Sequence, residues 1–221
     1  MNPEFWHKCW ERNTIGFHQP SVHQFLTEQV TNLLGSEGSA NAEKPNIFIP
    51  LCGKSLDMLW WAEQGNVVGS ELSDIACQDF FSENQLTPEV TSEGEHQLYQ
   101  FANLAIYQGD FFQLMPTQFP RFDYIYDRAA LIALPPALRQ QYVNHLASFI
   151  AEGTALVLIN LEYPAGELEG PPFTISADLV HQLFSDFDVT EVAVRDLQGD
   201  QFASRALPVS KLTERLFLIK R

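Results

Sequence analysis

Short apolar runs alternate along this chain with stretches in which apolar residues recur at helical spacing. The near-continuous apolar run at residues 154–161 is typical of a central parallel strand that is covered on both faces. Shorter runs predict further strands at residues 47–49, 67–68, 122–126, 189–194 and 216–219, and a hairpin at 98–107 that turns at Ala102-Asn103. Helical spacing predicts helices that begin near Pro20-Ser21, Ser55, Ser73, Pro135-Pro136 and Ser176.

The order of these elements predicts the fold class. Strands alternate with helices over most of the chain, which is the order of an α/β fold with a mostly parallel sheet and helices on both faces. The last two predicted strands have no helix between them, so we expect one antiparallel strand near the edge of the sheet. No Pro/Gly/Ser-rich linker and no repeat divides the 221 residues. We therefore expect a single domain that spans residues 1–221.

One strand–helix–strand unit, at residues 46–73, has the spacing of a site for an adenosine-containing cofactor. Its first strand ends at Pro50, and a glycine turn at Cys52-Gly53 leads into the helix. Because Gly53 has no side chain, the backbone there can approach a ligand closely. Glu71 ends the second strand, where a carboxylate can accept hydrogen bonds from both ribose hydroxyls.

Three kinds of nucleotide site compete for this unit. Gly53-Lys54-Ser55 is similar to the end of a phosphate-binding loop, but Phe48 stands where that loop requires a glycine. A dinucleotide site requires the pattern GxGxxG, and Gly53 is alone. S-Adenosylmethionine has no phosphate, so one glycine and an acidic strand end suffice for it. It is therefore the favoured cofactor, with a nicotinamide-dependent oxidoreductase and a non-catalytic adenosine-ligand-binding module as the alternatives.

Composition and charge oppose several classes of function. The chain has 28 acidic and 13 basic residues and a formal net charge of -15, without the Lys/Arg cluster that nucleic-acid binding requires. No apolar run approaches the roughly twenty residues that span a bilayer. Cys9, Cys52 and Cys77 form no CxxC pair, and their spacing to the histidines fits no common zinc site. We therefore expect a cytoplasmic protein that binds no metal, nucleic acid or membrane.

Two further segments carry candidate ligand contacts. Residues 1–20 are rich in aromatic side chains, and Trp6 and Trp10 would share one face of a helix. This segment is either an amphipathic helix that packs on the core or a flap whose aromatic side chains cover a ligand. Phe111 and Phe112 follow a predicted strand, and they either contact an adenine or belong to the core.

Several segments, spread over nearly the whole chain, match one known family. They are FWHKCWERNTIGFHQP, IFIPLCGKSLDMLWWAEQGNVVGSELS, GDFF, FDYIYDRAALIALPP and LEYPAGELEGPPF. Through these segments the sequence resembles the thiopurine S-methyltransferase family in its bacterial form, and PLCGKSLDMLW and YDRAALIALPP are highly specific to it. Departures are few: Cys9 stands where an arginine is common, and Ser70 replaces a usual apolar residue.

The resemblance implies a Rossmann-like class I methyltransferase fold, with a seven-stranded, mostly parallel sheet and one antiparallel strand. It also implies S-adenosyl-L-methionine as the cofactor and S-adenosyl-L-homocysteine as the product. The positions that match the family's cofactor site are Trp10, Phe17, Leu51, Cys52, Gly53, Glu71, Leu72, Phe111, Phe112 and Arg128. Among them, Trp10 and Phe17 would close over the cofactor as part of a flap at residues 1–20, and Glu71 would bind the ribose.

The resemblance further implies methyl transfer to the sulfur of aromatic or heterocyclic thiols such as thiopurines, with selenium or tellurium species as further acceptors. Such a transfer is an in-line displacement in which the thiolate is the reactive form of the acceptor. Arg128, with Arg205 as a second candidate, would favour the thiolate through its positive charge. The alternative is that Arg128 pairs structurally with Asp127 or with a loop carboxylate. We expect a monomer that acts on a small aromatic thiol.

Overall fold

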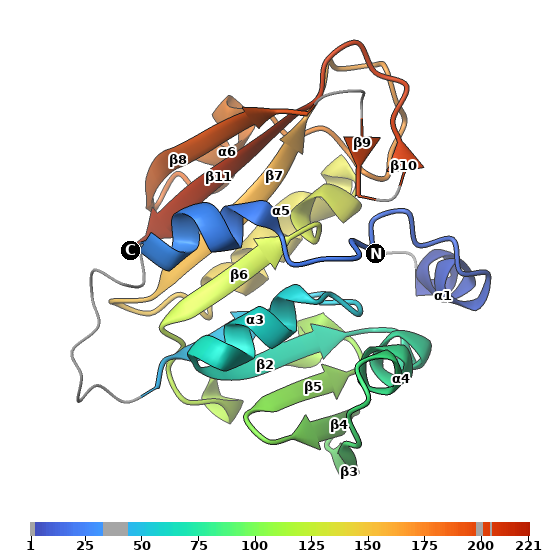
Figure 1. The fold of residues 1–221 in the computed structure, drawn as a ribbon. Helices are drawn as coiled ribbons and strands as arrows, with labels where there is room; N and C mark the ends of the chain where they lie inside the picture. The colour runs from blue at the N-terminus through green and yellow to red at the C-terminus, as the bar shows by residue number, and fades with distance from the viewer. Residues whose placement is uncertain (1–2, 33–43, 198–200, 204) are drawn as a thin grey trace.

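The computed structural model describes residues 3–32, 44–197, 201–203 and 205–221. Within these residues, a nine-stranded sheet lies between helices (Figure 1), with the strand order β3-β4-β5-β2-β1-β6-β7-β11-β8. Its strands are β1 Asn46–Ile49, β2 Asn66–Glu71, β3 Glu89–Glu93, β4 His96–Phe101, β5 Leu104–Gln108, β6 Tyr124–Arg128, β7 Ala155–Glu162, β8 Asp188–Asp196 and β11 Thr213–Lys220. A separate pair consists of β9 Gln201–Phe202 and β10 Arg205–Ala206.

The strand directions confirm the predicted α/β class but correct two of its details. The neighbouring strands β5, β2, β1, β6 and β7 run parallel. β11 is antiparallel to β7 and β8, and β4 is antiparallel to β3 and β5. The described part of the chain thus has nine strands in this sheet rather than seven, and two strands that run against the parallel block rather than one. β3 was not predicted because all of its residues are exposed, so it has no apolar pattern.

The helices cover both faces of the sheet, as the sequence pattern predicts. They are α1 Pro3–Glu11, α3 Asp57–Gln64, α4 Asp74–Glu83, α5 Pro136–Ala147 and α6 Ala177–Leu183, with short helical turns η1 Leu26–Val30, η2 Phe111–Gln113, η3 Pro116–Gln118 and η4 Leu131–Ala133. Phe48 of β1 belongs to the same buried cluster as Tyr142 of α5. Its neighbour Ile47 belongs to a second cluster with Trp61 of α3 and Phe80 of α4. Because successive strand residues face opposite sides, both faces of β1 are buried.

The helix predicted to begin at Pro20-Ser21 begins later. Residues 24–32 are helical, with a π-helical turn at Leu26–Val30. The backbone N–H of His23 donates to Oδ1 of Asp57 at 2.8 Å. This hydrogen bond ties the chain before the helix to α3. The remainder of the predicted helix lies outside the described residues.

Other local predictions are confirmed. Ser73 caps α4, and its Oγ accepts the N–H of Ala76 at 3.3 Å. β4 and β5 form the predicted hairpin, with Phe101 paired to Leu104 across the turn. None of the helices within the described residues combines the length and the apolar character that crossing a bilayer requires.

Candidate functional site

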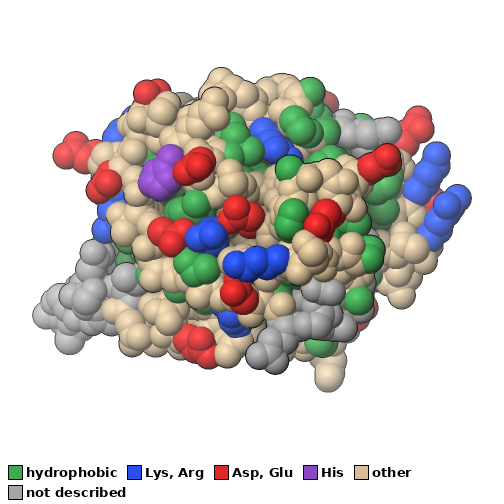
Figure 2. Space-filling view, turned by 90° about the horizontal axis from the view of Figure 1, so that it is seen from above, with side chains coloured by type: hydrophobic (Ala, Val, Ile, Leu, Met, Phe, Trp, Pro, Cys, Tyr) green, Lys and Arg blue, Asp and Glu red, His purple; other side chains and the backbone are tan. Residues whose placement is uncertain are grey.

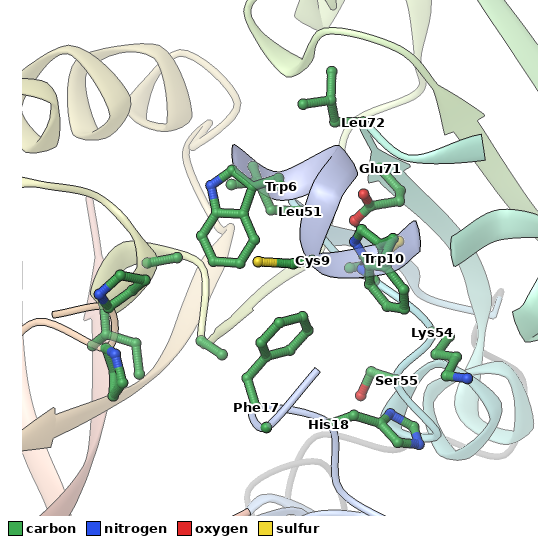
Figure 3. Close-up of a pocket in the computed structure, with 18 of the residues that line it drawn as sticks. Trp6, Cys9, Trp10, Phe17, His18, Leu51, Lys54, Ser55, Glu71 and Leu72 are labelled. Atoms are coloured by element: carbon green, nitrogen blue, oxygen red, sulfur yellow. Dashed lines mark hydrogen bonds between the residues drawn. The ribbon is translucent and has the colours of Figure 1, made fainter. Parts of the chain in front are cut away.

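The carboxyl ends of β1, β2 and β6 border a cavity of about 420 Å³, a size typical of small-molecule sites. This is the edge of the sheet at which open α/β folds bind their ligands. Figure 3 shows side chains of α1, of the turn after β1 and of the end of β2 around this space. The described residues that line it are Phe5, Trp6, Cys9, Trp10, Thr14, Gly16, Phe17, His18, Leu51, Cys52, Gly53, Lys54, Ser55, Glu71, Leu72, Arg128, Ala129, Ile132, Ala133, Gly170, Pro171 and Pro172.

The turn after β1 brings backbone groups to the cavity. Leu51 and Gly53 have positive φ angles of 48° and 54°, a conformation that glycine adopts at low cost. The N–H of Cys52 donates to the carbonyl oxygen of Ser70 at 2.9 Å, which anchors the turn to β2. A Cβ atom added at residue 53 would lie 3.4 Å from the ring of Trp10. This is an ordinary van der Waals distance, so it is the backbone conformation that favours glycine at residue 53.

Glu71 is buried at the end of β2, and both of its carboxylate oxygens are engaged. Oε2 accepts the N–H of Gly53 at 2.8 Å, and Oε1 accepts the N–H of Ser73 at 2.7 Å. Burial raises the pKa of this carboxyl, while the hydrogen bonds from the backbone of Ser73, Gly53 and Leu72 oppose the rise. Because a carboxylate offers about four acceptor positions, each oxygen can still accept a bond from a ligand hydroxyl. The side chain thus fixes the glycine turn and faces the cavity at once.

Arg128 ends β6 and is held from two sides. Its Nε donates to Oδ2 of Asp57 at 2.6 Å, and its Nη2 donates to Oγ of Ser55 at 2.8 Å. Its Nη1 is buried and has no hydrogen-bond partner among the described residues. Buried donors are normally satisfied, and Arg128 lines the cavity. Within the described structure, Arg128 thus has one unsatisfied buried donor, Nη1, at the wall of the cavity.

The partner of Arg128 is Asp57 rather than Asp127, the neighbour considered from the sequence. Asp57 also accepts the hydroxyl of Tyr126 at 3.0 Å. Burial alone would raise the pKa of Asp57, but Arg128 and the hydrogen-bond donors around the carboxylate hold this pKa below its usual value. Asp127 lies on the other side of β6, where its carboxylate accepts the hydroxyl of Tyr142 at 2.8 Å. Arg128 and Asp57 therefore form a buried ion pair at the cavity wall.

Aromatic side chains of α1 and of the loop after it cover one side of the cavity (Figure 3). The ring centroid of Phe17 lies 5.7 Å from that of Trp6 and 5.7 Å from that of Trp10, and both contacts are edge-to-face. Trp10 is only 6% exposed, whereas Phe5 at the outer end is 42% exposed. The N-terminal segment is thus helical, and its aromatic side chains lie against the cavity.

Two predicted site residues, Phe111 and Phe112, are not among the described residues that line the cavity. Phe111 is 3% exposed, and its ring packs against those of Phe48 and His145, with ring centroids 6.2 and 4.7 Å apart. Phe111 thus belongs to the buried core cluster, and the ring of Phe112 likewise packs against that of His145. Arg205 lies in β10, and its side chain lies outside the described part of the chain.

Several polar residues of the site, among them His18, Lys54 and Asp57, were not predicted from the sequence. His18 and Lys54 line the cavity, and Lys54 is held by an ion pair with Glu83 at 2.6 Å. Asp57 lies behind the wall, 71 residues from its partner Arg128, so no local pattern connects them. The position of His18 beside Phe17 was the available signal for that residue. No group of three or more His, Cys, Asp or Glu side chains in the described ranges could hold a metal ion.

Comparison with known sequences gives one consistent result. The family model described as thiopurine S-methyltransferase matches residues 1–221. The thiopurine S-methyltransferase of Shewanella oneidensis is 43% identical to this chain over 225 residues, and that of Marinobacter nauticus is 40% identical over 225 residues. In both comparisons, 100% of each chain is covered.

Solved structures with a similar fold are S-adenosylmethionine-dependent methyltransferases. One, from Anabaena variabilis, has a TM-score of 0.65 at 15% identity and covers 99% of this chain and 94% of its own. Magnesium protoporphyrin IX methyltransferase of Synechocystis, solved with S-adenosylhomocysteine bound, has a TM-score of 0.63 at 15% identity, with 99% and 98% covered. At this identity the likeness concerns the fold alone, and it confirms the predicted class I methyltransferase fold.

Proposed function

Since this chain belongs to the thiopurine S-methyltransferase family, it is an S-adenosylmethionine-dependent S-methyltransferase, and we propose that its acceptors are aromatic and heterocyclic thiols, thiopurines among them. The observation that carries the proposal is the aromatic cover that Trp6, Trp10 and Phe17 form over the cavity. Flat, apolar walls of this kind suit a planar heteroaromatic ring. The family and the similar thiopurine S-methyltransferases do not favour the two alternatives, a nicotinamide-dependent oxidoreductase and a non-catalytic binding module.

The residues of the cavity fit the cofactor. S-Adenosylmethionine, when bound, supplies a methyl group on a positively charged sulfur. We propose that Glu71 accepts the ribose hydroxyls, since its carboxylate is aimed by two backbone amides and retains free lone pairs. Leu72 would pack beside the adenine, and Leu51, Cys52 and Gly53 would line the ribose and methionine side. The unpartnered Nη1 of Arg128 suits an anionic group, either the cofactor's carboxylate or the acceptor thiolate.

The chain's own residues then bind, orient and exclude water. Trp10 and Phe17 would shield the reacting groups from solvent, which strengthens the polar interactions inside the cavity. Arg128 would stabilise an anionic acceptor by hydrogen-bond donation from Nη1. Asp57 neutralises much of the charge of Arg128. The stabilisation of the anionic acceptor would therefore depend more on the direction of the hydrogen bond from Nη1 than on a net positive charge. Arg205 remains a proposed second cation on the basis of the family pattern.

Several broader expectations belong to the same proposal. Residues 1–20 would act as a flap over the cofactor within a single domain of residues 1–221. Selenium or tellurium species would be further acceptors, because they share the soft, polarisable character of a thiolate. The protein would act as a monomer, and it would do so in the cytoplasm without a nucleic-acid or membrane partner.

A methylation assay tests the acceptor class. The protein is incubated with S-adenosylmethionine and a panel of thiopurines, other aromatic thiols, alkyl thiols, selenite and tellurite, and the products are identified by mass spectrometry. We expect equal amounts of methyl thioether and S-adenosylhomocysteine with the aromatic thiols. The matched thioethers, which have no free S–H group, serve as controls and should yield neither product. Methyl transfer to alkyl thiols, selenite or tellurite but to none of the aromatic thiols would overturn the proposal.

A further inference from the structure

We propose that His18 accepts the proton of the acceptor thiol, a role that rests on the proposed thiol-methylating function. Methylation of a neutral thiol releases one proton, and the thiolate is the form that attacks. A group that removes this proton has to line the cavity, has to be unprotonated, and has to be able to pass the proton on to solvent. His18 meets these requirements through its position, its hydrogen bonds and its surroundings.

The position of His18 connects the cavity to a second, more open pocket. His18 follows Phe17, the aromatic residue of the cover, and lines the cavity together with Ser55 and Arg128. It also lines the outer pocket, of about 530 Å³, which the described residues Asn13, Thr14, Ile15, Gly16, His18, Pro20, Lys54 and Glu83 form. Figure 3 shows its imidazole beside Ser55 and Lys54, below the ring of Phe17. His18 thus borders both spaces, as do Thr14, Gly16 and Lys54.

The imidazole of His18 is not committed to another contact. Its backbone N–H donates to the carbonyl oxygen of Ile15 at 2.8 Å, which fixes the loop that carries the ring. Neither ring nitrogen has a hydrogen-bond partner within the described residues, and the side chain is half-buried. A neutral imidazole has one nitrogen that accepts a proton. That nitrogen is therefore available to a ligand.

The groups that face His18 keep its imidazole neutral. Burial is the largest cause that lowers its pKa below the usual 6.5, and the positive charges of Lys54 and Arg128 act in the same direction. Glu83 and Asp57 oppose this shift. Because each of them is ion-paired with one of the two cations, the charges largely cancel and burial decides the direction. At neutral pH the ring is consequently in its basic form.

Apart from Cys9, which also lines the cavity, the other ionisable side chains of the cavity are engaged or unsuitable. Both oxygens of Glu71 accept backbone amides, and Lys54 is ion-paired with Asp79 and Glu83. Burial raises the pKa of the Cys52 thiol well above its usual value, so Cys52 stays protonated. Arg128 is a donor only.

In the proposed step, the S–H bond of the acceptor breaks and its proton moves to the free ring nitrogen of His18. The electron pair left on the acceptor sulfur forms the new bond to the methyl carbon, and the pair of the broken methyl–sulfonium bond stays on the departing sulfur, which becomes neutral. The imidazolium then gives the proton to water in the outer pocket. One thiol proton is released for each methyl group transferred, so charge and atoms balance.

The test compares His18→Gln with the wild type on thiols of different acidity. Loss of a general base typically slows a reaction by about 10²-fold or more. We expect kcat/KM of the variant to fall by about this factor for thiols that are protonated at neutral pH. For strongly acidic aromatic thiols, which are already ionised, the fall should be less than about threefold, because no proton has to be removed. His181→Gln, an exposed histidine on α6, is the matched control and should match the wild type on both classes.

Two direct measurements accompany the kinetics. Calorimetry with S-adenosylhomocysteine should give the same affinity for His18→Gln and the wild type, since His18 acts on the acceptor. Nuclear magnetic resonance of the His18 ring should show a pKa below the usual 6.5. An equal loss with acidic and weakly acidic thiols, or no loss with either, would overturn the role of His18 while leaving thiol methylation intact. A wild type that methylates no thiol would overturn the function itself and, with it, this role.

Discussion

At the scale of single residues, Glu71 has two tasks that compete for one carboxylate. Its oxygens hold the backbone amides of Gly53 and Ser73, and its remaining lone pairs face the cavity. A carboxylate can do both because it presents acceptors on both oxygens and no donor. The geometry of the glycine turn and the affinity for the cofactor's ribose should therefore depend on the same side chain.

Replacement of Glu71 by Gln tests this dual role. The amide has only one acceptor oxygen, so its NH₂ group would face one of the two backbone N–H groups, and one ribose contact would be lost. Hydrogen bonds to charged groups contribute about 1.5–3 kcal/mol, so we expect the affinity for S-adenosylhomocysteine to fall roughly 10- to 100-fold. Calorimetry measures this change, with the exposed Glu63→Gln as the control. Equal affinity in both variants would show that Glu71 does not bind the ribose.

Asp127 gives a prediction about pH. Burial raises its pKa from 3.8 to about 6. The protonated form is therefore favoured in the folded protein, and the stability this provides is present below the unfolded pKa and is lost as the pH rises through the folded pKa. Relative to Asp127→Asn, the free energy of unfolding of the wild type should thus fall by about 3 kcal/mol between about pH 4 and pH 7. Urea unfolding of both proteins across this range measures it; a difference that does not vary with pH would contradict the assignment.

At the scale of elements, the junction between β1 and α3 carries most of the site. Within a few residues it provides the turn at Gly53, the hydroxyl of Ser55 and the carboxylate of Asp57. The last two bind Arg128 at the end of β6, so α3 and β6 are joined at the cavity wall. The orientation of Arg128 is therefore set by α3 rather than by its own strand.

Removal of the charge on Asp57 tests this connection. In Asp57→Asn the guanidinium of Arg128 stays buried without its anionic partner, and breaking such a pair from one side costs about 3–5 kcal/mol. We expect the free energy of unfolding in urea to fall by about this amount, and the affinity for S-adenosylhomocysteine to fall as Nη1 loses its fixed direction. Asp186→Asn, at an exposed position, should change neither quantity. A variant as stable as that control would show that the pair does not support the site.

The elements also show what the sequence could predict. Local signals sufficed where one segment decides its own structure: the glycine turn at Gly53, the cap at Ser73 and the buried run of β7 are all found as predicted. Local signals failed where contacts with residues far away in the sequence decide the structure. β3 has no buried side, the chain before residue 24 is bound by Asp57, and Arg128 is paired across 71 positions. The family resemblance named eight of the 22 described cavity residues, but it gave no contacts and no role for His18.

At the scale of the whole molecule, the cavity is connected to the far edge of the sheet by buried polar groups. Asp57 accepts the backbone N–H of His23, and Nε2 of His23 lies 3.3 Å from Oε1 of Glu214 on β11. Glu214 in turn pairs with Arg195 of β8 at 2.6 Å. Figure 2 shows acidic and basic side chains beside one another on the face seen from above. The antiparallel strands β8 and β11 therefore support the cavity wall through Asp57 as well as completing the sheet.

The most direct test is a crystal structure of the protein with S-adenosylhomocysteine and an aromatic thiol. The account predicts the ribose hydroxyls on Glu71, the homocysteine part along the turn at Gly53, and the thiol under Trp10 and Phe17 with its sulfur within reach of His18. A product bound elsewhere, or a Glu71 carboxylate turned away from the sugar, would contradict it.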